Sequence, residues 1–325
     1  MPLARVRALG HELAIFVSEE LLTVDFAVRN PVWSWFYSRV VRPLVAIPRS
    51  LFARPAPITD APTGKPKTTF NGKSLIEVES DAPDEAKQLA QQASQIEWYH
   101  TFDLGHGIVT PGAFDHSPIL HHYRLPDSLA GRSVLDVACF DGFWAMEFER
   151  RGADRVVALD IDEAKELDLP PVVRQKMTEE ELHRKMGDGF RLVHRAKNSR
   201  VERVHCNVYD LSPDSLGSFD IVHIGDVFLH LQNPFKALAN VARVTQGYAL
   251  ISDVFDPRLD RLGNHPILEF RGGIEDCVWW YFSFEGLEKM IWDAGFKKVE
   301  LLARFKYGMR GNRQQMWHAV FKASM

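Results

Sequence analysis

The chain has 325 residues, enough for one large or two modest domains with a full hydrophobic core. Hydrophobic residues make up 46% and charged residues 25%, as in ordinary globular proteins, and the formal net charge of −4 argues against a strongly basic nucleic-acid-binding protein. Three widely spaced cysteines indicate neither a disulfide framework nor a zinc ribbon, so we expect a cytoplasmic protein. The sequence shows no secretory signal and no apolar run long enough for a membrane span.

Residues 1–56 differ in character from the rest of the chain. Apolar residues fall near helical spacing from Leu9 to Val28, and Pro31 ends the pattern, so we expect an N-terminal helical extension. Arginines then flank aromatic residues, which is compatible with peripheral contact with an anionic membrane surface. Acidic residues share the first helix, so packing on the catalytic domain or a dimer contact is favoured.

Residues 57–92 are predicted to form a linker rich in proline, glycine and lysine, followed by a polar lead-in helix that starts at Asp84. The segment after it carries Trp98, Tyr99 and His100 and, between two glycines, His106. All four are candidates for the wall of a ligand cleft, and the glycines would allow a mobile lid. Packing against the sheet edge is the alternative for Trp98.

A group of histidines follows this segment. It consists of His116, His121 and His122. Because no carboxylate stands at ligand spacing, we expect no metal site there.

The stretch from Ser133 to Ile161 predicts one strand–helix–strand unit. Apolar β-branched residues open and close it, and residues 143–152 between them have helical periodicity. Such a unit implies a parallel sheet. Asp136 and Asp160 stand near the two strand ends, 24 residues apart, and an acid in the second position hydrogen-bonds a ribose in nucleotide-binding sheets. The ligand should therefore carry a ribose.

The turn between the first strand and its helix, Asp136 to Gly142, resembles motif I of the Rossmann-like S-adenosylmethionine-dependent methyltransferases. In that motif an acid is followed by three alternating glycines, whereas here Ala138 and Phe140 take the first two places. We expect Phe140 to restrict the path of the loop. The G-x-G-x-x-G of dinucleotide sites is absent, which disfavours nicotinamide and flavin cofactors.

The resemblance implies a Rossmann-like α/β fold with a seven-stranded sheet, six strands parallel and one antiparallel, over residues 93–325. It also implies S-adenosylmethionine as cofactor, with the Asp136-to-Gly142 turn at the methionine end. Further cofactor-binding candidates from this resemblance are Trp98, Asp136, Ala138, Gly142, Asp160, Ile161, Asn207, Val208 and Gly225. Asn207 suits the adenine edge because an amide both donates and accepts, with a simple Asx turn as the alternative.

Residues 93–322 resemble in particular a bacterial group related to the tRNA wobble-uridine carboxymethyltransferases. In that group a tryptophan and lysines of the approach segment hold the carboxylate of carboxy-S-adenosylmethionine. Residues 93–115 contain neither lysine nor arginine, so plain S-adenosylmethionine is the expected donor.

Catalysis would need a proton acceptor beside the transferred methyl group. Asp226 and His230 are four residues apart and would share a helical face, and His106 is a third candidate. For His230, a structural hydrogen bond is the alternative.

Together these features predict an enzyme that O-methylates a small hydroxylated acceptor, sugar-like or from secondary metabolism. Two alternatives are kept. One is tRNA uridine modification, which the acidic balance and the missing lysines disfavour. The other is a catalytically silent, cofactor-binding or membrane-associated partner subunit.

Overall fold

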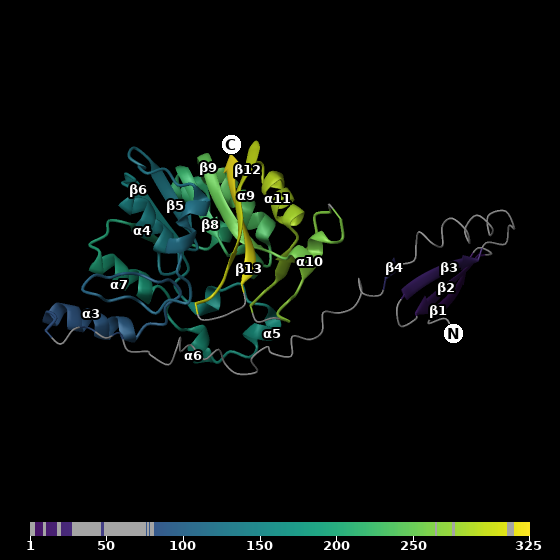
Figure 1. Ribbon diagram of the computed structural model, residues 1–325, viewed down its shortest axis with the longest axis horizontal. Helices are drawn as coiled ribbons and strands as arrows, with labels where there is room; N and C mark the ends of the chain where they lie inside the picture. The colour runs from purple at the N-terminus through teal and green to yellow at the C-terminus, as the bar shows by residue number, and fades with distance from the viewer. Residues whose placement is uncertain are drawn as a thin grey trace. The chain divides into compact units, whose positions relative to one another are not determined.

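The chain divides into two compact units, Met1–Lys67 and Thr68–Met325. The computed structural model describes residues 4–8, 11–17, 21–27, 47–48, 76, 78, 81–263, 265–274, 277–310 and 315–325. The larger unit is a seven-stranded sheet with helices on both faces (Figure 1).

The strands of the large sheet are β5 (Ser133–Val137), β6 (Arg155–Asp160), β7 (Glu202–His205), β8 (Phe219–Gly225), β9 (Thr245–Phe255), β12 (Lys298–Tyr307) and β13 (Met316–Ser324). Their order is β12-β13-β9-β8-β5-β6-β7. Pairing is parallel from β9 to β7, whereas β13 is antiparallel to both β9 and β12. The predicted Rossmann-like sheet of six parallel strands and one antiparallel strand is confirmed.

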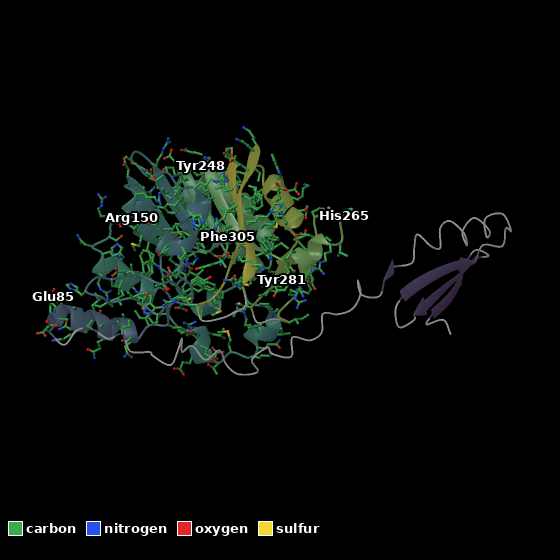
Figure 2. All side chains as sticks on the ribbon, viewed as in Figure 1. Glu85, Arg150, Tyr248, His265, Tyr281 and Phe305 are labelled. Carbon is green, nitrogen blue, oxygen red and sulfur yellow. The ribbon has the colours of Figure 1, made fainter. Side chains whose placement is uncertain are left out.

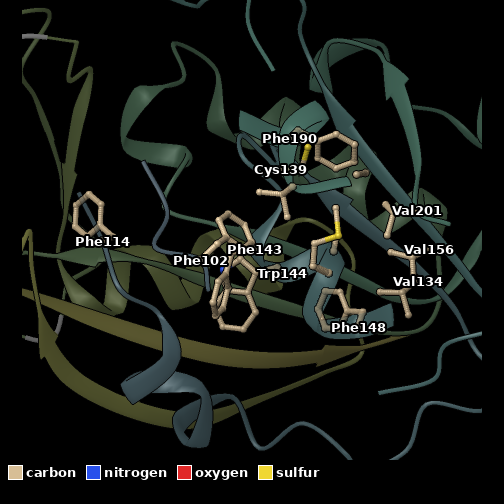
Figure 3. Packing of buried hydrophobic residues seen from close by; sticks show 14 of the residues in the cluster. Phe102, Phe114, Val134, Cys139, Phe143, Trp144, Phe148, Val156, Phe190 and Val201 are labelled. Atoms are coloured by element: carbon tan, nitrogen blue, oxygen red, sulfur yellow. The ribbon is translucent and has the colours of Figure 1, made fainter. Parts of the chain in front are cut away.

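Two apolar layers hold the helices against the sheet. Side chains alternate across a strand, so Val134 faces one layer and Leu135 the other. The first layer contains residues of α4 (Phe143–Arg150) and α7 (Asp188–Ala196), among them Phe148 and Phe190 (Figure 3). The second contains residues of α9 (Pro234–Val244) and α11 (Phe284–Asp293).

The remaining helices are short. They are α5 (Pro171–Arg174), α6 (Glu179–Leu182), α8 (Pro213–Leu216) and α10 (Pro257–Asp260), with 3-10 helices at Ser117–Tyr123, Ala164–Glu166, Val208–Asp210 and Phe228–His230. A small hairpin pairs β10 (Leu268–Phe270) with β11 (Trp280–Phe282). Among the described residues, no helix is long and apolar enough to cross a membrane.

The lead-in helix α3 (Asp84–Ser94) begins where it was predicted. Ala86, Ala90 and Ala93 on one face of α3 are buried in the first apolar layer, and α3 contacts α7. The helix is therefore part of the large unit. The domain boundaries at residues 56 and 92 stay predictions.

The helix predicted between Leu9 and Val28 is wrong. The chain instead forms antiparallel strands β1 (Ala4–Ala8), β2 (His11–Val17) and β3 (Leu21–Ala27), with β4 (Ile47–Pro48) paired to β3. Ala8 of β1 pairs with His11 of β2, and Glu12 of β2 with Ala27 of β3. In β3 the apolar Leu22, Val24 and Phe26 alternate with Thr23 and Asp25, a period of two that the helical interpretation overlooked. The aromatic stretch after Pro31 lies outside the described residues.

Candidate functional site

A cavity of about 290 Å³ opens at the carboxyl ends of the parallel strands β5, β6 and β8. Open parallel sheets bind ligands at this edge because the loops that leave adjacent strands meet there. Nine predicted site residues line the cavity: Asp136, Ala138, Asp160, Ile161, Asn207, Val208, Gly225, Asp226 and His230. The predicted residues thus lie together at one cavity, and their roles in binding and catalysis stay predictions.

Three predicted residues do not line the cavity. Trp98 is buried, and its indole N–H donates to the Ala93 carbonyl at 2.8 Å, so it packs in the core. His106 is exposed on a turn with a left-handed backbone. Gly142 starts α4 with a φ of 88°, and a Cβ there would lie 2.5 Å from the Phe190 ring. Gly142 thus serves helix packing, and Trp98 and His106 are withdrawn as cleft residues.

The loop after β5 follows the path that glycines would give it. Ala138 and Phe140 have φ angles of 58° and 48°, in the left-handed region that disfavours side chains. The loop expected to be restricted by Phe140 thus keeps a left-handed backbone at both non-glycine positions, at a cost in strain. The Phe140 side chain is 37% exposed and its ring lies 5.2 Å from that of Tyr99, so it borders the cavity without filling it.

Replacing Ala138 with glycine should stabilise the protein. A non-glycine residue in the left-handed region destabilises the folded state by about 1–2 kcal/mol, and glycine removes this strain. Glycine also raises the conformational entropy of the unfolded chain, which cancels part of the gain. We expect Ala138→Gly to raise the free energy of unfolding by about 0.5–1 kcal/mol in urea denaturation. Ala145→Gly, inside α4, is the control and should lower it by about 1 kcal/mol. If both variants lower the free energy of unfolding equally, the backbone of Ala138 is not strained.

Asp160 ties this loop to the end of β6. One carboxylate oxygen accepts the N–H of Phe140 at 2.5 Å, and the other accepts the N–H of Ile161 at 2.7 Å. Burial raises the pKa of Asp160 to about 6, although both hydrogen bonds act in the opposite direction. The oxygen bonded to Ile161 keeps a second lone pair for a ligand hydroxyl, whereas the oxygen bonded to Phe140 also faces Sγ of Cys139 at 3.8 Å, a weak donor that a hydroxyl can displace.

Asp136 forms a buried pair with a histidine that sequence reasoning missed. One Asp136 oxygen accepts the N–H of Ala145 at 3.0 Å, and the other lies 2.8 Å from Nδ1 of His223. Both side chains are 2% exposed. His223 stands between apolar residues of β8, where a histidine looks like an ordinary core residue; its one signal was that it faces away from Val222 and Ile224.

The buried carboxylate of Asp141 holds the approach segment against the cavity. It accepts the backbone N–H groups of Tyr99 at 2.8 Å and His100 at 2.9 Å. Burial raises the pKa of Asp141 to about 7, against the effect of these two donors. As a result Tyr99, His100 and His116 line the cavity together. Tyr99 and His100 were cleft candidates from the sequence, whereas their contacts with Asp141 join residues about 40 positions apart and leave no local pattern.

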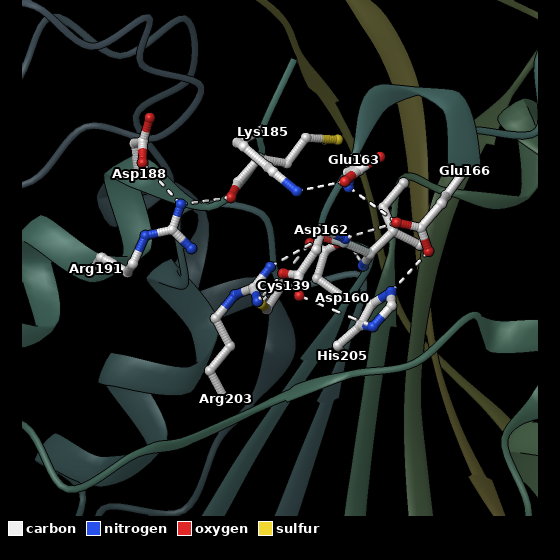
Figure 4. Close-up of polar contacts among 12 residues, drawn as sticks. Cys139, Asp160, Asp162, Glu163, Glu166, Lys185, Asp188, Arg191, Arg203 and His205 are labelled. Carbon is white, nitrogen blue, oxygen red and sulfur yellow. Dashed lines mark hydrogen bonds and ion pairs between the residues drawn. The ribbon is translucent and has the colours of Figure 1, made fainter. Parts of the chain in front are cut away.

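The charged excursion after β6 forms one wall of the cavity, with Glu166, Leu167, Asp168 and Leu169. At its base Glu166 pairs with His205 at 2.7 Å, and Arg203 pairs with Asp162 (Figure 4). Further along, one Asp168 oxygen accepts the N–H of Gln232 at 2.7 Å. These bonds fix the wall to strands and loops of the sheet.

Asn207 forms the Asx turn that was the alternative to its adenine role. Its side-chain oxygen accepts the N–H of Tyr209 at 3.0 Å. The amide N–H₂ group is the remaining donor of this side chain.

Asp226 and His230 both line the cavity but do not share a helical face. Asp226 has a left-handed φ of 54°, and the 3-10 helix with His230 begins only at Phe228. The predicted helical spacing is therefore wrong. Nδ1 of His230 lies 3.3 Å from the carbonyl oxygen of Cys277, which matches the structural alternative. One Asp226 oxygen lies 3.4 Å from Nε2 of His318.

The cavity lining is acidic. Its carboxylates are Asp136, Asp160, Glu166, Asp168 and Asp226, and among the described residues no lysine or arginine lines it. Such a lining suits a cationic ligand with a ribose and offers nothing to balance a phosphate. The residues present therefore fit a sulfonium nucleoside.

Residues 118–301 match the family described as "Methyltransferase domain", and the chain belongs to this family. It is an S-adenosylmethionine-dependent methyltransferase with S-adenosylmethionine as its cofactor, the class that the Asp136-to-Gly142 turn predicted.

Two comparisons accompany this assignment. A magnesium-protoporphyrin O-methyltransferase of Rhodobacter capsulatus is 34% identical over 116 residues, which are 34% of this chain and 39% of that enzyme's length. The N-terminal domain of EvdMO1, crystallised in the presence of SAH and D-fucose, has a TM-score of 0.50 and 18% identity, with coverage of 76% of this chain and 99% of that one. The second likeness shows the fold alone.

Proposed function

We propose that the protein transfers a methyl group from S-adenosylmethionine to a hydroxyl group of a small-molecule acceptor. The acidic cavity, without lysine or arginine in its described lining, carries this proposal. It favours the sulfonium donor over a carboxylated one and gives a nucleic-acid phosphate no partner. The similar Rhodobacter capsulatus enzyme is named an O-methyltransferase, and the EvdMO1 domain was crystallised with a sugar, which agrees with a small acceptor.

In this proposal the strand-end residues hold the cofactor. Asp160 accepts the ribose hydroxyls through its remaining lone pairs, and Asn207 with Val208 contacts the adenine. The loop from Asp136 to Ala138 lies at the methionine end. Gly225 lines the cavity at the end of β8, where a Cβ would lie 2.7 Å from Oγ of Ser252 and 3.3 Å from Nε2 of His223, so these neighbours leave no space for a side chain.

The bound cofactor supplies a methyl group on a sulfonium, and methyl transfer is an in-line displacement. The protein therefore contributes mainly position and proton removal. Asp226 is our candidate proton acceptor, because it lines the cavity and its strained backbone is fixed by the N–H donated to the Ser252 carbonyl at 3.0 Å.

The test combines binding with transfer. Calorimetry should show binding of S-adenosylhomocysteine and weaker binding of carboxy-S-adenosylmethionine than of S-adenosylmethionine. Labelled methyl from S-adenosylmethionine should then pass to a component of a small-molecule extract. Cofactor binding without methyl transfer would favour a catalytically silent subunit. Methyl transfer to tRNA would overturn the proposal of a small-molecule acceptor.

Cofactor binding should weaken in acid. Only the ionised form of Asp160 accepts both ribose hydroxyls, so lowering the pH through its pKa of about 6 removes an acceptor. We expect the Kd for S-adenosylhomocysteine to be about tenfold higher at pH 5 than at pH 7. Asp160→Asn should remove the pH dependence of the Kd. If the Kd of that variant still rises in acid, another group causes the dependence.

A further inference from the structure

Five buried polar atoms gather beside the cavity without a hydrogen-bond partner in the described part of the chain. They are Nδ1 of His100, Nδ1 of His116, Nε2 of His223, Oδ1 of Asp226 and the hydroxyl oxygen of Tyr307. All but Tyr307 belong to cavity-lining residues. An unpaired buried polar atom is costly, so a group of them at a cavity indicates a polar ligand. We name these five residues the histidine subsite.

Ring contacts make the subsite continuous. The ring of His116 lies 4.9 Å from that of His100 and 5.3 Å from that of Tyr307. Trp144 lies 5.7 Å from His116 and 4.6 Å from His223, and so joins the two ends. Figure 3 shows Trp144 beside Phe102 and Phe143, which close the subsite on its apolar side. The subsite thus combines aromatic walls with buried polar atoms.

His100 and His116 are neutral imidazoles, which both donate and accept. Burial lowers the pKa of His100 to about 3 and that of His116 well below its usual value. In His223, Nδ1 faces the Asp136 carboxylate at 2.8 Å and donates to it, so Nε2 is the ring atom left for a ligand. Neutral imidazoles match hydroxyl groups, which also both donate and accept.

The charges exclude an anionic acceptor. Asp226 is the charged member of the subsite, and no described residue of the cavity lining carries a guanidinium or ammonium group. A carboxylate or phosphate bound here would be desolvated next to Asp226 without compensation. Aromatic faces such as Tyr99 and Trp144 instead suit the C–H face of a ring.

We infer that the histidine subsite binds the methyl acceptor, and that this acceptor is an uncharged ring compound with several hydroxyl groups, such as a glycosyl unit or a cyclic polyol. The inference rests on the proposed function. One hydroxyl oxygen forms the new bond to the methyl carbon while the carbon–sulfur bond breaks, and its electron pair stays on sulfur as the neutral thioether. The hydroxyl proton passes to Asp226. The other hydroxyls pair with the histidines.

The first experiment separates acceptors by charge. A metabolite extract of the native host is divided on an anion exchanger at pH 8, and each fraction is incubated with the full-length protein and methyl-labelled S-adenosylmethionine. We expect the acceptor in the unretained fraction, with a product that resists mild alkaline hydrolysis as an ether does. An acceptor in the retained fraction, or an ester product, would overturn the inference while leaving methyl transfer intact. No transfer from either fraction would instead defeat the proposed function.

The second experiment removes single unpaired atoms. Tyr307→Phe and His116→Phe delete a buried polar atom and keep a ring of similar size. We expect each to raise the Tm by about 2 °C, because an uncompensated polar group is lost. The Kd for S-adenosylhomocysteine should stay within about twofold. The kcat/KM for the neutral acceptor fraction should fall about tenfold, because one hydrogen bond to the acceptor is lost.

The matched control is Tyr248→Phe. Tyr248 lies near the amino-terminal end of β9, away from the cavity lining (Figure 2). This variant should leave kcat/KM unchanged. If Tyr307→Phe and His116→Phe also gain stability but keep full kcat/KM, the unpaired atoms are packing defects and the subsite is wrongly assigned.

Discussion

Replacing Asp160 with alanine is expected to weaken S-adenosylhomocysteine binding at least about 100-fold at pH 7.5. The ribose diol would donate two hydrogen bonds to this carboxylate, and each charge-assisted bond contributes about 1.5–3 kcal/mol. A loss of about 3 kcal/mol corresponds to roughly 100-fold in Kd. The side chain also fixes the loop through the N–H groups of Phe140 and Ile161, so its loss acts in the same direction. Isothermal calorimetry measures the effect directly.

Asp162→Ala is the matched control for this variant. Asp162 stands two residues further on, pairs with Arg203 and does not line the cavity. Its replacement should change the Kd less than about threefold, as expected for a partly exposed ion pair. Thermal unfolding shows whether either variant retains its fold. If folded Asp160→Ala binds as tightly as the unmodified protein, the ribose assignment is wrong.

The strand–helix–strand unit was predictable because its signals are local. Apolar periodicity changes from strand to helix and back within 30 residues, and the acids at the two strand ends mark the edge of the sheet where ligands bind. The hairpins of residues 4–27 were missed for a related reason. A short segment with many leucines and valines fits the period of a strand as well as that of a helix. The glycine at position 10 of the sequence, a residue typical of turns, was not taken into account.

The acceptor side of the cavity was much harder to predict. His100, His116 and His223 come together only because the chain folds the approach segment onto β8, and Asp141 holds it there. Nothing in the spacing of these histidines distinguishes them from core residues. Conversely, Trp98 looked like a ligand-contacting residue until its indole was seen to donate within the α3 region. Long-range contacts therefore assemble the side of the cavity that we propose for the acceptor, whereas local motifs mark the side that we propose for the cofactor.

Asp226→Asn is expected to lower kcat by about 100- to 1,000-fold with little change in S-adenosylhomocysteine affinity. A positioned general base contributes about 10²- to 10⁴-fold, and an amide cannot accept the proton. Asparagine is the suitable replacement because it tolerates the left-handed backbone of this position, so the loop should keep its geometry. Initial rates of methyl transfer at saturating S-adenosylmethionine measure the effect, and calorimetry with S-adenosylhomocysteine checks that cofactor affinity is retained.

His230→Gln distinguishes the two candidate bases. Nδ1 of His230 faces the Cys277 carbonyl, so its ring is already engaged. Oδ1 of Asp226 instead accepts no hydrogen bond from any described residue and lies 3.4 Å from Nε2 of His318. We therefore expect His230→Gln to reduce kcat less than about tenfold, as the loss of one structural hydrogen bond would. The reverse ranking, with His230→Gln nearly inactive and Asp226→Asn active, would move the base to His230. The acceptor hydroxyl would then lose its proton on the side of the Cys277 loop, and the acceptor subsite would include His230 in place of Asp226.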